Sequence, residues 1–257
     1  MDPKITELLN LVFRWIHVIA GVMWIGHLWF FNFVNAQVAK TYDADSKKKV
    51  IPELMPRALY WFRWGAAYTW ITGILLLGIV YYMGGVLVEP SQSSGVAIGA
   101  GLGGLVVAWV IYDLLWKQMA KNEMVGAIVS FVLITIAAFA LNMVMSGRAL
   151  FIHIGGILGT IMAANVWMRI WPNQRKIITA TKAGTAPPDG LVPLAGLRSK
   201  HNTYMSVPLM LFMVSNHFPT VFGDDLRWLW AAIIIAIGWG MAKLMYGKSA
   251  TPAPASF

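Results

Sequence analysis

Five histidines lie inside or at the ends of apolar stretches of this chain, where an imidazole has few ordinary uses. They are His17, His27, His153, His201 and His217. Ionisable or metal-ligating groups in a bilayer are costly, and they generally face the interior of a helix bundle and mark a functional path or a ligand. For any single histidine the alternative is a hydrogen bond that ties two helices together. Because all five are placed in this way, the pattern favours a metal or haem site.

The depths expected for these residues separate them into two levels. Near the outer leaflet the expected group is His17, His153 and His217, each from a different helix. His27 and His201 then form a second, inner level. A b-type haem needs one or two axial imidazoles and space for a flat ring. The sequence therefore predicts one or two haem b groups with these histidines as iron ligands.

Two polar neighbours support the same interpretation. Arg14 lies one turn before the first histidine, at the outer edge, where a guanidinium can pair with a haem propionate. Asn216 directly precedes the last histidine, where an amide can orient an iron ligand through a hydrogen bond.

Apolar helices must hold these residues in place. The 257-residue chain is 58% hydrophobic and only 12% charged, whereas charged residues approach a quarter of a soluble domain. About twenty apolar residues are needed for a helix to cross the hydrocarbon layer. Seven such runs are present, with approximate cores at 10–37, 59–83, 96–116, 124–145, 149–171, 203–219 and 227–246. The fold class predicted is an all-α integral membrane bundle of about seven transmembrane helices.

The cationic residues indicate the orientation of this bundle. Cytoplasmic loops carry the excess of Lys and Arg. The predicted inner side holds fifteen of the twenty Lys and Arg residues, the outer side three, and the spans the other two. We therefore expect the N-terminus outside, the C-terminus inside and a location in a bacterial inner membrane. A single transmembrane domain is expected over residues 1–248, with a disordered tail at 249–257. The net charge of +9 follows from this topology and does not indicate nucleic acid binding.

Other patterns predict helix packing or exclude whole classes of chemistry. Small residues at four-residue spacing predict close helix contacts at Gly95, Gly99 and Gly103 and at Gly155 and Gly159. The absence of cysteine excludes disulfides, thiolate zinc sites, iron–sulfur clusters and covalent c-type haem. No GxSxG, HExxH or P-loop signature is present, which argues against a hydrolase, a zinc protease or a nucleotide-driven pump.

One buried ion pair and one loop are also predicted. Asp113 and Arg63 are expected at similar depth near the inner ends of their helices, so they are predicted to pair. The longest polar connection, at about 172–202, is predicted as a loop of some thirty residues.

Three stretches carry a resemblance to a known family. FIHIGGILGTIMAANVWMRIWPNQRK and KHNTYMSVPLMLFMVSNHFP resemble the membrane domain of the bacterial membrane-bound urate oxidase (urate hydroxylase) family, and RWIHVIAGVMWIGH resembles its first helix. The resemblance covers most of the chain. It implies oxidation of urate to 5-hydroxyisourate with electrons passed to a cytochrome c, a domain that family members usually carry fused at the C-terminus. Here that domain is expected to be absent, so the implied acceptor is a separate cytochrome c, another redox subunit or quinone.

Given this resemblance, oxidation of a purine needs a positive group for the anion and a sink for electrons. Arg198, Lys200 and Asn202, at the predicted junction of the loop and the sixth helix, are the candidates for binding a small planar purine anion from the cytoplasm. The alternative is that they only mark the positive inner side. Two other functions stay open: a non-catalytic, haem-binding electron-transfer or accessory subunit of a larger membrane oxidase or respiratory complex, and a copper permease.

Overall fold

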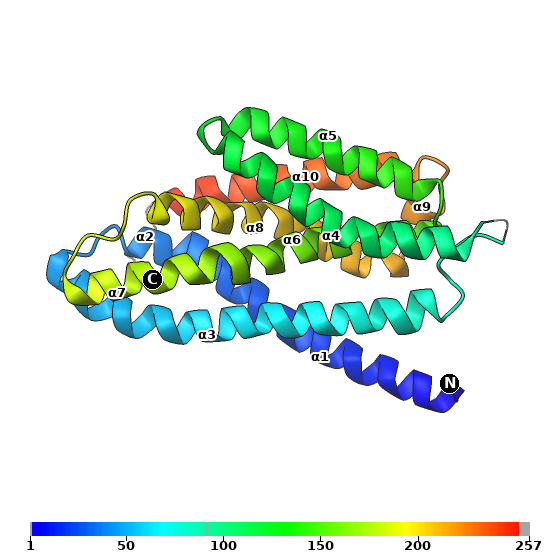
Figure 1. Ribbon diagram of the computed structural model, residues 1–257, viewed down its shortest axis with the longest axis horizontal. Helices are drawn as coiled ribbons and strands as arrows, with labels where there is room; N and C mark the ends of the chain where they lie inside the picture. Colours follow the sequence, from blue (N-terminus) through cyan, green and yellow to red (C-terminus); the bar gives the residue numbers. More distant parts are fainter. Residues whose placement is uncertain (1, 91, 252–257) are drawn as a thin grey trace.

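The chain folds into a bundle of long helices that run along a common axis (Figure 1). The computed structural model describes residues 2–90 and 92–251, and every regular element in these ranges is a helix. Their bounds are α1 Pro3–Trp29, η1 Phe30–Asn35, α2 Ala36–Val38, α3 Ala44–Leu76, η2 Leu77–Tyr82, α4 Ser94–Gln118, η3 Met119–Lys121, α5 Glu123–Asn142, α6 Gly147–Asn165, η4 Val166–Ile170, α7 Trp171–Ala183, α8 Leu191–Val214, η5 Ser215–His217, α9 Pro219–Phe222 and α10 Arg227–Ala250.

Several of these elements join into continuous rods. α1, η1 and α2 form one helix, as do α3 with η2, and α6 with η4 and α7, each containing a π-helical stretch of one to two turns. Successive rods run in opposite directions, so the two ends of the described chain lie toward opposite ends of the bundle (Figure 1). Chain ends at opposite ends of the bundle are expected when an odd number of rods runs along it.

Six rods are long and apolar enough to cross a membrane: Pro3–Val38, Ala44–Tyr82, Ser94–Lys121, Glu123–Asn142, Gly147–Ala183 and Arg227–Ala250. The seventh rod is α8, which packs against α6 and α10. It is too polar to qualify because its first half contains Arg198, Lys200 and Asn202. Its 24 residues still extend about 36 Å, enough to traverse the bundle.

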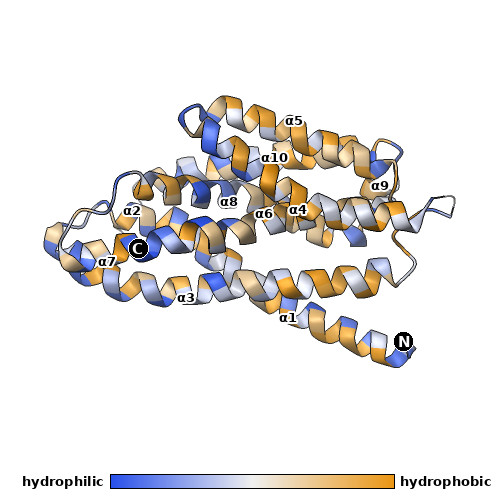
Figure 2. Ribbon diagram, viewed as in Figure 1, coloured by the Kyte–Doolittle hydropathy of each residue, from blue (hydrophilic) through white to orange (hydrophobic). Residues whose placement is uncertain are grey.

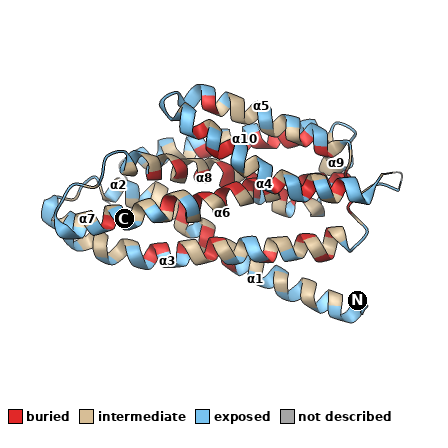
Figure 3. Ribbon diagram, in the orientation of Figure 1, coloured by how far each residue is buried: buried red, intermediate tan, exposed pale blue. Residues whose placement is uncertain are grey.

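The centre of the bundle is α6, whose neighbours are α3, α4, α5, α8 and α10. Most of its side chains are buried, from Leu150 and Phe151 to Met162 (Figure 3). The outward faces of the other rods remain apolar, with large exposed side chains such as Leu11, Val106 and Leu244 (Figure 2). An apolar exterior of this kind is the arrangement expected for contact with lipid.

Glycines mark several of the closest helix approaches, and among the predicted glycines only Gly155 makes one. The prediction for α6 is confirmed at that position, because a Cβ at Gly155 would lie 2.6 Å from the Met213 Cε atom of α8. The prediction for α4 is wrong: Gly99 and Gly103 face open space, and the tight contact is made by Gly101. Four-residue spacing identifies a stripe of small residues, but it does not say which neighbour the stripe faces.

The predicted thirty-residue loop is also wrong. α7 continues to Ala183 and α8 begins at Leu191, so only residues 184–190 connect them. The hydropathy signal fails here because α7 is a solvated helix and the buried polar side chains of α8 find their partners on α4 and α6. At the C-terminus, Ser249 and Ala250 belong to α10, and residues 252–257 of the predicted tail lie outside the described residues.

Candidate functional site

A single buried carboxylate on α4 gathers three cationic side chains. Asp113 accepts two hydrogen bonds from the Arg169 guanidinium of η4, at 2.9 Å from Nε and 2.5 Å from Nη2. The Arg198 Nη2 atom of α8 lies 3.0 Å from Asp113 Oδ1, and the Lys117 Nζ atom lies 3.0 Å from Oδ2. Three positive charges against one negative charge leave an excess of two. We call these four residues the Asp113 cluster.

The predicted pair between Asp113 and Arg63 is wrong. The Arg63 guanidinium instead lies 4.0 Å from the centre of the Trp171 ring, a cation–π contact with α7. Asp113 faces η4 and α8, whereas Arg63 faces α7. Similar depth in a membrane therefore did not imply the same side of the bundle.

A chain of hydrogen bonds around Tyr112 adjoins this cluster. The Asn165 Nδ2 group donates to the Tyr112 hydroxyl at 2.9 Å and to the Asn202 Oδ1 atom at 2.9 Å. The Tyr112 hydroxyl also lies 2.8 Å from His201 Nδ1. The Arg198 guanidinium carbon lies 5.0 Å from the centre of the Tyr112 ring. α4, α6 and α8 thus converge on one phenol.

Several polar atoms in this region have no partner within the described residues. They are Nε and Nη1 of Arg198 and Oδ1 of Asn165, all three buried. A buried polar group without a partner costs about 1–3 kcal/mol, more when it is charged. The site therefore contains unused donors and an unused acceptor close to one another through Tyr112, and it is suited to a small ligand that carries both an anionic acceptor and a donor.

The structure places the three predicted substrate-binding residues differently from one another. Arg198 and Asn202 are fully buried within α8, not at its start, and both belong to the region around Tyr112. Lys200 does not point there, because its Nζ atom lies 2.6 Å from Glu123 Oε2 in a half-exposed ion pair. The assumed loop–helix junction is wrong for all three, since α8 begins seven residues before Arg198.

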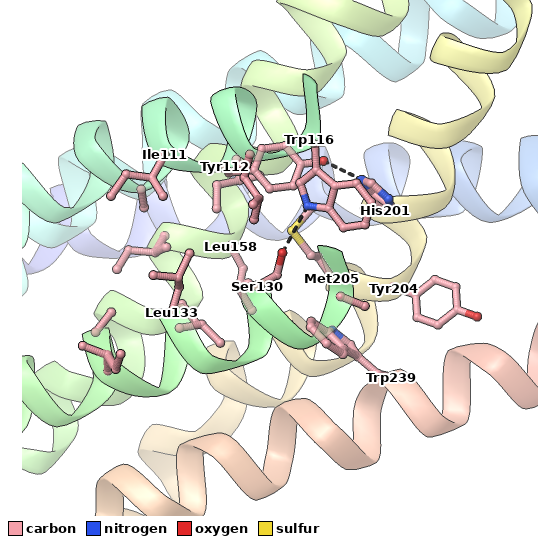
Figure 4. Close-up of a pocket in the computed structure, with 18 of the residues that line it drawn as sticks. Ile111, Tyr112, Trp116, Ser130, Leu133, Leu158, His201, Tyr204, Met205 and Trp239 are labelled. Atoms are coloured by element: carbon pink, nitrogen blue, oxygen red, sulfur yellow. Dashed lines mark hydrogen bonds between the residues drawn. The ribbon is translucent and has the colours of Figure 1, made fainter. Parts of the chain in front are cut away.

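Next to the Tyr112 ring is a cavity of about 830 Å³ between α4, α5, α6, α8 and α10. Its polar end is formed by Tyr112, Trp116, Ser130 and His201, and the rest of its wall is almost entirely apolar (Figure 4). The Trp116 indole donates to Ser130 Oγ at 3.1 Å, and its ring centre lies 3.9 Å from that of His201.

Sequence reasoning missed most of this site. Tyr112, Trp116 and Asn165 were not identified, and Arg169 was counted only as a positive-inside residue. The available signal was the presence of Asp113 and Asn165 inside apolar runs, because polar groups in such helices face the bundle interior.

At the opposite end of the bundle, His153 is fully buried between two tyrosines. Its Nδ1 atom lies 2.7 Å from the Ala149 carbonyl, and its Nε2 atom lies 3.0 Å from the Tyr82 hydroxyl. The neighbouring Tyr81 hydroxyl accepts a hydrogen bond from Asn216 Nδ2 at 2.8 Å. Asn216 is therefore linked to His153 only through Tyr81, whose ring contacts the imidazole edge to face.

The other predicted outer residues are not brought to His153. The His17 Nδ1 atom lies 3.1 Å from Thr72 Oγ1, ten residues before the tyrosine that contacts His153, which corresponds to about 15 Å along a helix. Arg14 donates to Asn10 of its own helix, and His217 is exposed.

The two predicted inner histidines are also separate. His27 Nδ1 lies 2.7 Å from the Met23 carbonyl in its own helix, whereas His201 belongs to the cavity near Tyr112. Over the described ranges, no group of three or more His, Asp or Glu residues is placed to hold a metal ion.

The surroundings of His153 do not fit a haem as they are packed. Both ring nitrogens have partners, and a Cβ at Gly101 would lie 2.7 Å from Nε2, so the α4 backbone covers the atom that would bind iron. One or two haem b groups remain a prediction from the sequence.

Comparison with known proteins identifies the family. The family described as "Urate oxidase N-terminal" matches residues 3–50 and 42–252, almost the whole chain. The chain therefore belongs to that family. No curated protein and no solved structure matches it.

Proposed function

We propose, from membership of the urate oxidase N-terminal family, that the chain is a membrane redox protein that binds urate at the Asp113 cluster and oxidises it. The observation that carries this proposal is the excess of two positive charges around Asp113, together with the two unpartnered donors of the buried Arg198. A planar purine anion offers acceptors for a guanidinium fork and ring N–H groups for an amide oxygen.

The residues have distinct roles in this proposal. Arg198 holds the anion through Nε and Nη1, while Asp113 fixes the guanidinium through Nη2. Asn165 Oδ1 accepts a ring N–H of the purine, and Asn202 orients Asn165. The Tyr112 ring packs against the Arg198 guanidinium.

The more exposed cations mark the route to the site. The side chains of Lys117 and Arg169 are 54% and 31% exposed, whereas that of Arg198 is 1% exposed. Lys117 lies one turn nearer than Asp113 to the end of α4 that we assign to the cytoplasm. Urate would approach from that side, attracted by the excess charge, and displace Lys117 and Arg169 to reach Arg198.

The reaction releases two electrons. Urate and water give 5-hydroxyisourate, two protons and two electrons, so a separate acceptor is required. The chain would deliver these electrons to a cytochrome c, another redox subunit or quinone, within a bacterial inner membrane with its N-terminus outside and C-terminus inside. Six long apolar helices support the membrane location.

The test is urate-dependent reduction of an artificial acceptor, ferricyanide, by the purified protein in lipid nanodiscs. Replacing Arg198→Lys keeps the charge but removes the fork. Loss of one charge-assisted hydrogen bond is worth about 1.5–3 kcal/mol, so KM for urate should rise roughly ten- to hundredfold. Arg57→Lys is the matched control, because Arg57 contacts only Glu53 in an exposed pair. If KM for urate is the same in Arg198→Lys and Arg57→Lys, Arg198 does not bind urate.

An optical spectrum of the same sample separates the accessory function from the enzyme. Absence of urate-dependent reduction in a protein with a b-type haem spectrum would favour a non-catalytic electron-transfer subunit. A pyridine haemochrome assay would give the number of haems.

A further inference from the structure

We propose that the cavity between α4, α5, α6, α8 and α10 is a binding site for a membrane quinone. Its volume of about 830 Å³ falls within the range of roughly 300–1,000 Å³ typical of small-molecule sites. Its wall combines a long apolar surface with one polar end, which matches a molecule with a flat polar head and an apolar tail (Figure 4).

The cavity has an opening on the side of the bundle. Among the residues that line it, Val107 and Ile111 of α4 are 54% and 44% exposed, and Leu133 and Ile136 of α5 are 37% and 57% exposed. In a membrane this gap between α4 and α5 faces the lipid tails. A ligand dissolved in the bilayer can enter through it.

The polar end suits a neutral aromatic head. The Trp116 ring offers a flat face beside His201, and only the Nδ1 atom of that imidazole has a hydrogen-bond partner within the described residues. The second ring nitrogen of His201 is therefore available to a quinone carbonyl oxygen. The one acidic residue of the cavity wall, Glu123, is already paired with Lys200. The remaining charged residue of the wall, Lys243, is exposed. The buried recognition groups, Tyr112 and Trp116, are uncharged hydrogen-bonding groups, which favours a quinone over a phospholipid headgroup.

The position of the cavity gives it a role in the reaction, and this part of the inference rests on the proposed function. Tyr112 belongs both to the cavity wall and to the contacts of Arg198 and Asn165. Electron donor and acceptor would be held on two sides of one phenol ring. Urate, water and quinone would give 5-hydroxyisourate and quinol: water supplies the new oxygen, and two electrons and two protons pass to the quinone.

Binding can be tested without urate. The probe is decylubiquinone, and the readout is quenching of tryptophan fluorescence in phosphatidylcholine nanodiscs. Ala127→Phe places a ring in the cavity, and Ile128→Phe adds a ring on the exposed side of the same helix, outside the cavity. We expect saturable quenching for the unchanged chain and for Ile128→Phe, with an apparent Kd at least about tenfold higher for Ala127→Phe. His201→Leu should raise Kd by about three- to tenfold through the lost hydrogen bond.

Two results would overturn the site. Equal quenching in the unchanged chain, Ala127→Phe and Ile128→Phe would mean that the probe only partitions into the bilayer. Native mass spectrometry that finds a phospholipid retained by the unchanged chain and lost from Ala127→Phe, without displacement by decylubiquinone, would assign the cavity to lipid.

The role in turnover is tested separately. Ala127→Phe should lose urate oxidation with decylubiquinone as acceptor and keep it with ferricyanide. Failure with both acceptors in the unchanged chain would contradict the proposed function while leaving the binding result intact. Turnover with decylubiquinone that survives Ala127→Phe would contradict the role of the cavity alone.

Discussion

Replacement of Asp113 by asparagine is the sharpest test of how the bundle tolerates its buried charges. Asp113→Asn removes the carboxylate that, within the described part of the chain, alone contacts the Arg198, Arg169 and Lys117 cations. Because the Arg198 side chain is 1% exposed, it cannot regain hydration when its partner is lost. Removing one partner of a buried ion pair costs about 3–5 kcal/mol.

The other two cations add little to this cost. The Arg169 and Lys117 side chains are partly exposed, so water screens their interaction with Asp113 and each contributes about 0–1 kcal/mol. The destabilisation should therefore come almost entirely from Arg198. The exposed pair of Lys200 and Glu123 provides the control, and Glu123→Gln should change stability by less than about 1 kcal/mol.

A double-mutant cycle separates the charge effect from lost packing. Adding Arg198→Met to Asp113→Asn removes the uncompensated charge and should recover much of the lost stability. The assay is unfolding of the purified protein in detergent micelles by titration with sodium dodecyl sulfate, followed by tryptophan fluorescence. Two results would contradict a cost that comes from the uncompensated Arg198 charge. One is a loss of unfolding free energy in Asp113→Asn no larger than in Glu123→Gln. The other is a further loss of stability when Arg198→Met is added to Asp113→Asn.

Two further predictions concern the packing and the ends of the helices. A Cβ at Gly101 would lie 2.7 Å from the His153 ring, so Gly101→Ala should destabilise the bundle by about 1–3 kcal/mol. Gly99 faces open space, so Gly99→Ala should be neutral or slightly stabilising. Thermal unfolding of the two variants compares them directly. Asp43 caps α3 by accepting the Ser46 amide hydrogen at 2.7 Å, which lowers the pKa of this carboxyl from 3.8. Because the folded-state pKa is depressed, the cap stabilises the fold fully at neutral pH and loses this effect as the pH falls through the lowered pKa. The difference in melting temperature between the unchanged chain and Asp43→Ala, measured across a pH series, should therefore disappear at low pH.

The apolar helices were predictable because each signal is local. A run of about twenty apolar residues identifies a span without knowledge of its neighbours, and six of the seven expected spans are apolar rods in the structure. The boundaries were less predictable. α3 begins at Ala44, fifteen residues before its predicted apolar core, because solvated turns extend a helix beyond any hydrophobic layer.

The candidate site was less predictable, because it depends on which helix faces which. Arg198 and Asn202 were predicted by residue type at the junction of a loop and a helix, whereas the structure buries both inside α8. Depth along a helix can be counted from the sequence. The direction in which a side chain points depends on packing, which separated Asp113 from Arg63 and joined it to Arg169.

The polarity that hid α8 from the sequence also explains how it can lie in an apolar bundle. A helix with Arg198, Asn202 and Ser206 on its buried side is unfavourable alone in lipid, and it becomes tolerable only when other helices supply partners for those groups. Asp113 and Asn165 supply them for Arg198 and Asn202, and Trp29 of α1 donates to Ser206. The residues that we assign to urate binding are therefore the same ones that hold α8 in place. A substitution that disconnects α8 should impair binding and assembly together, which is why Arg198→Lys, with its charge retained, is the variant that can separate the two.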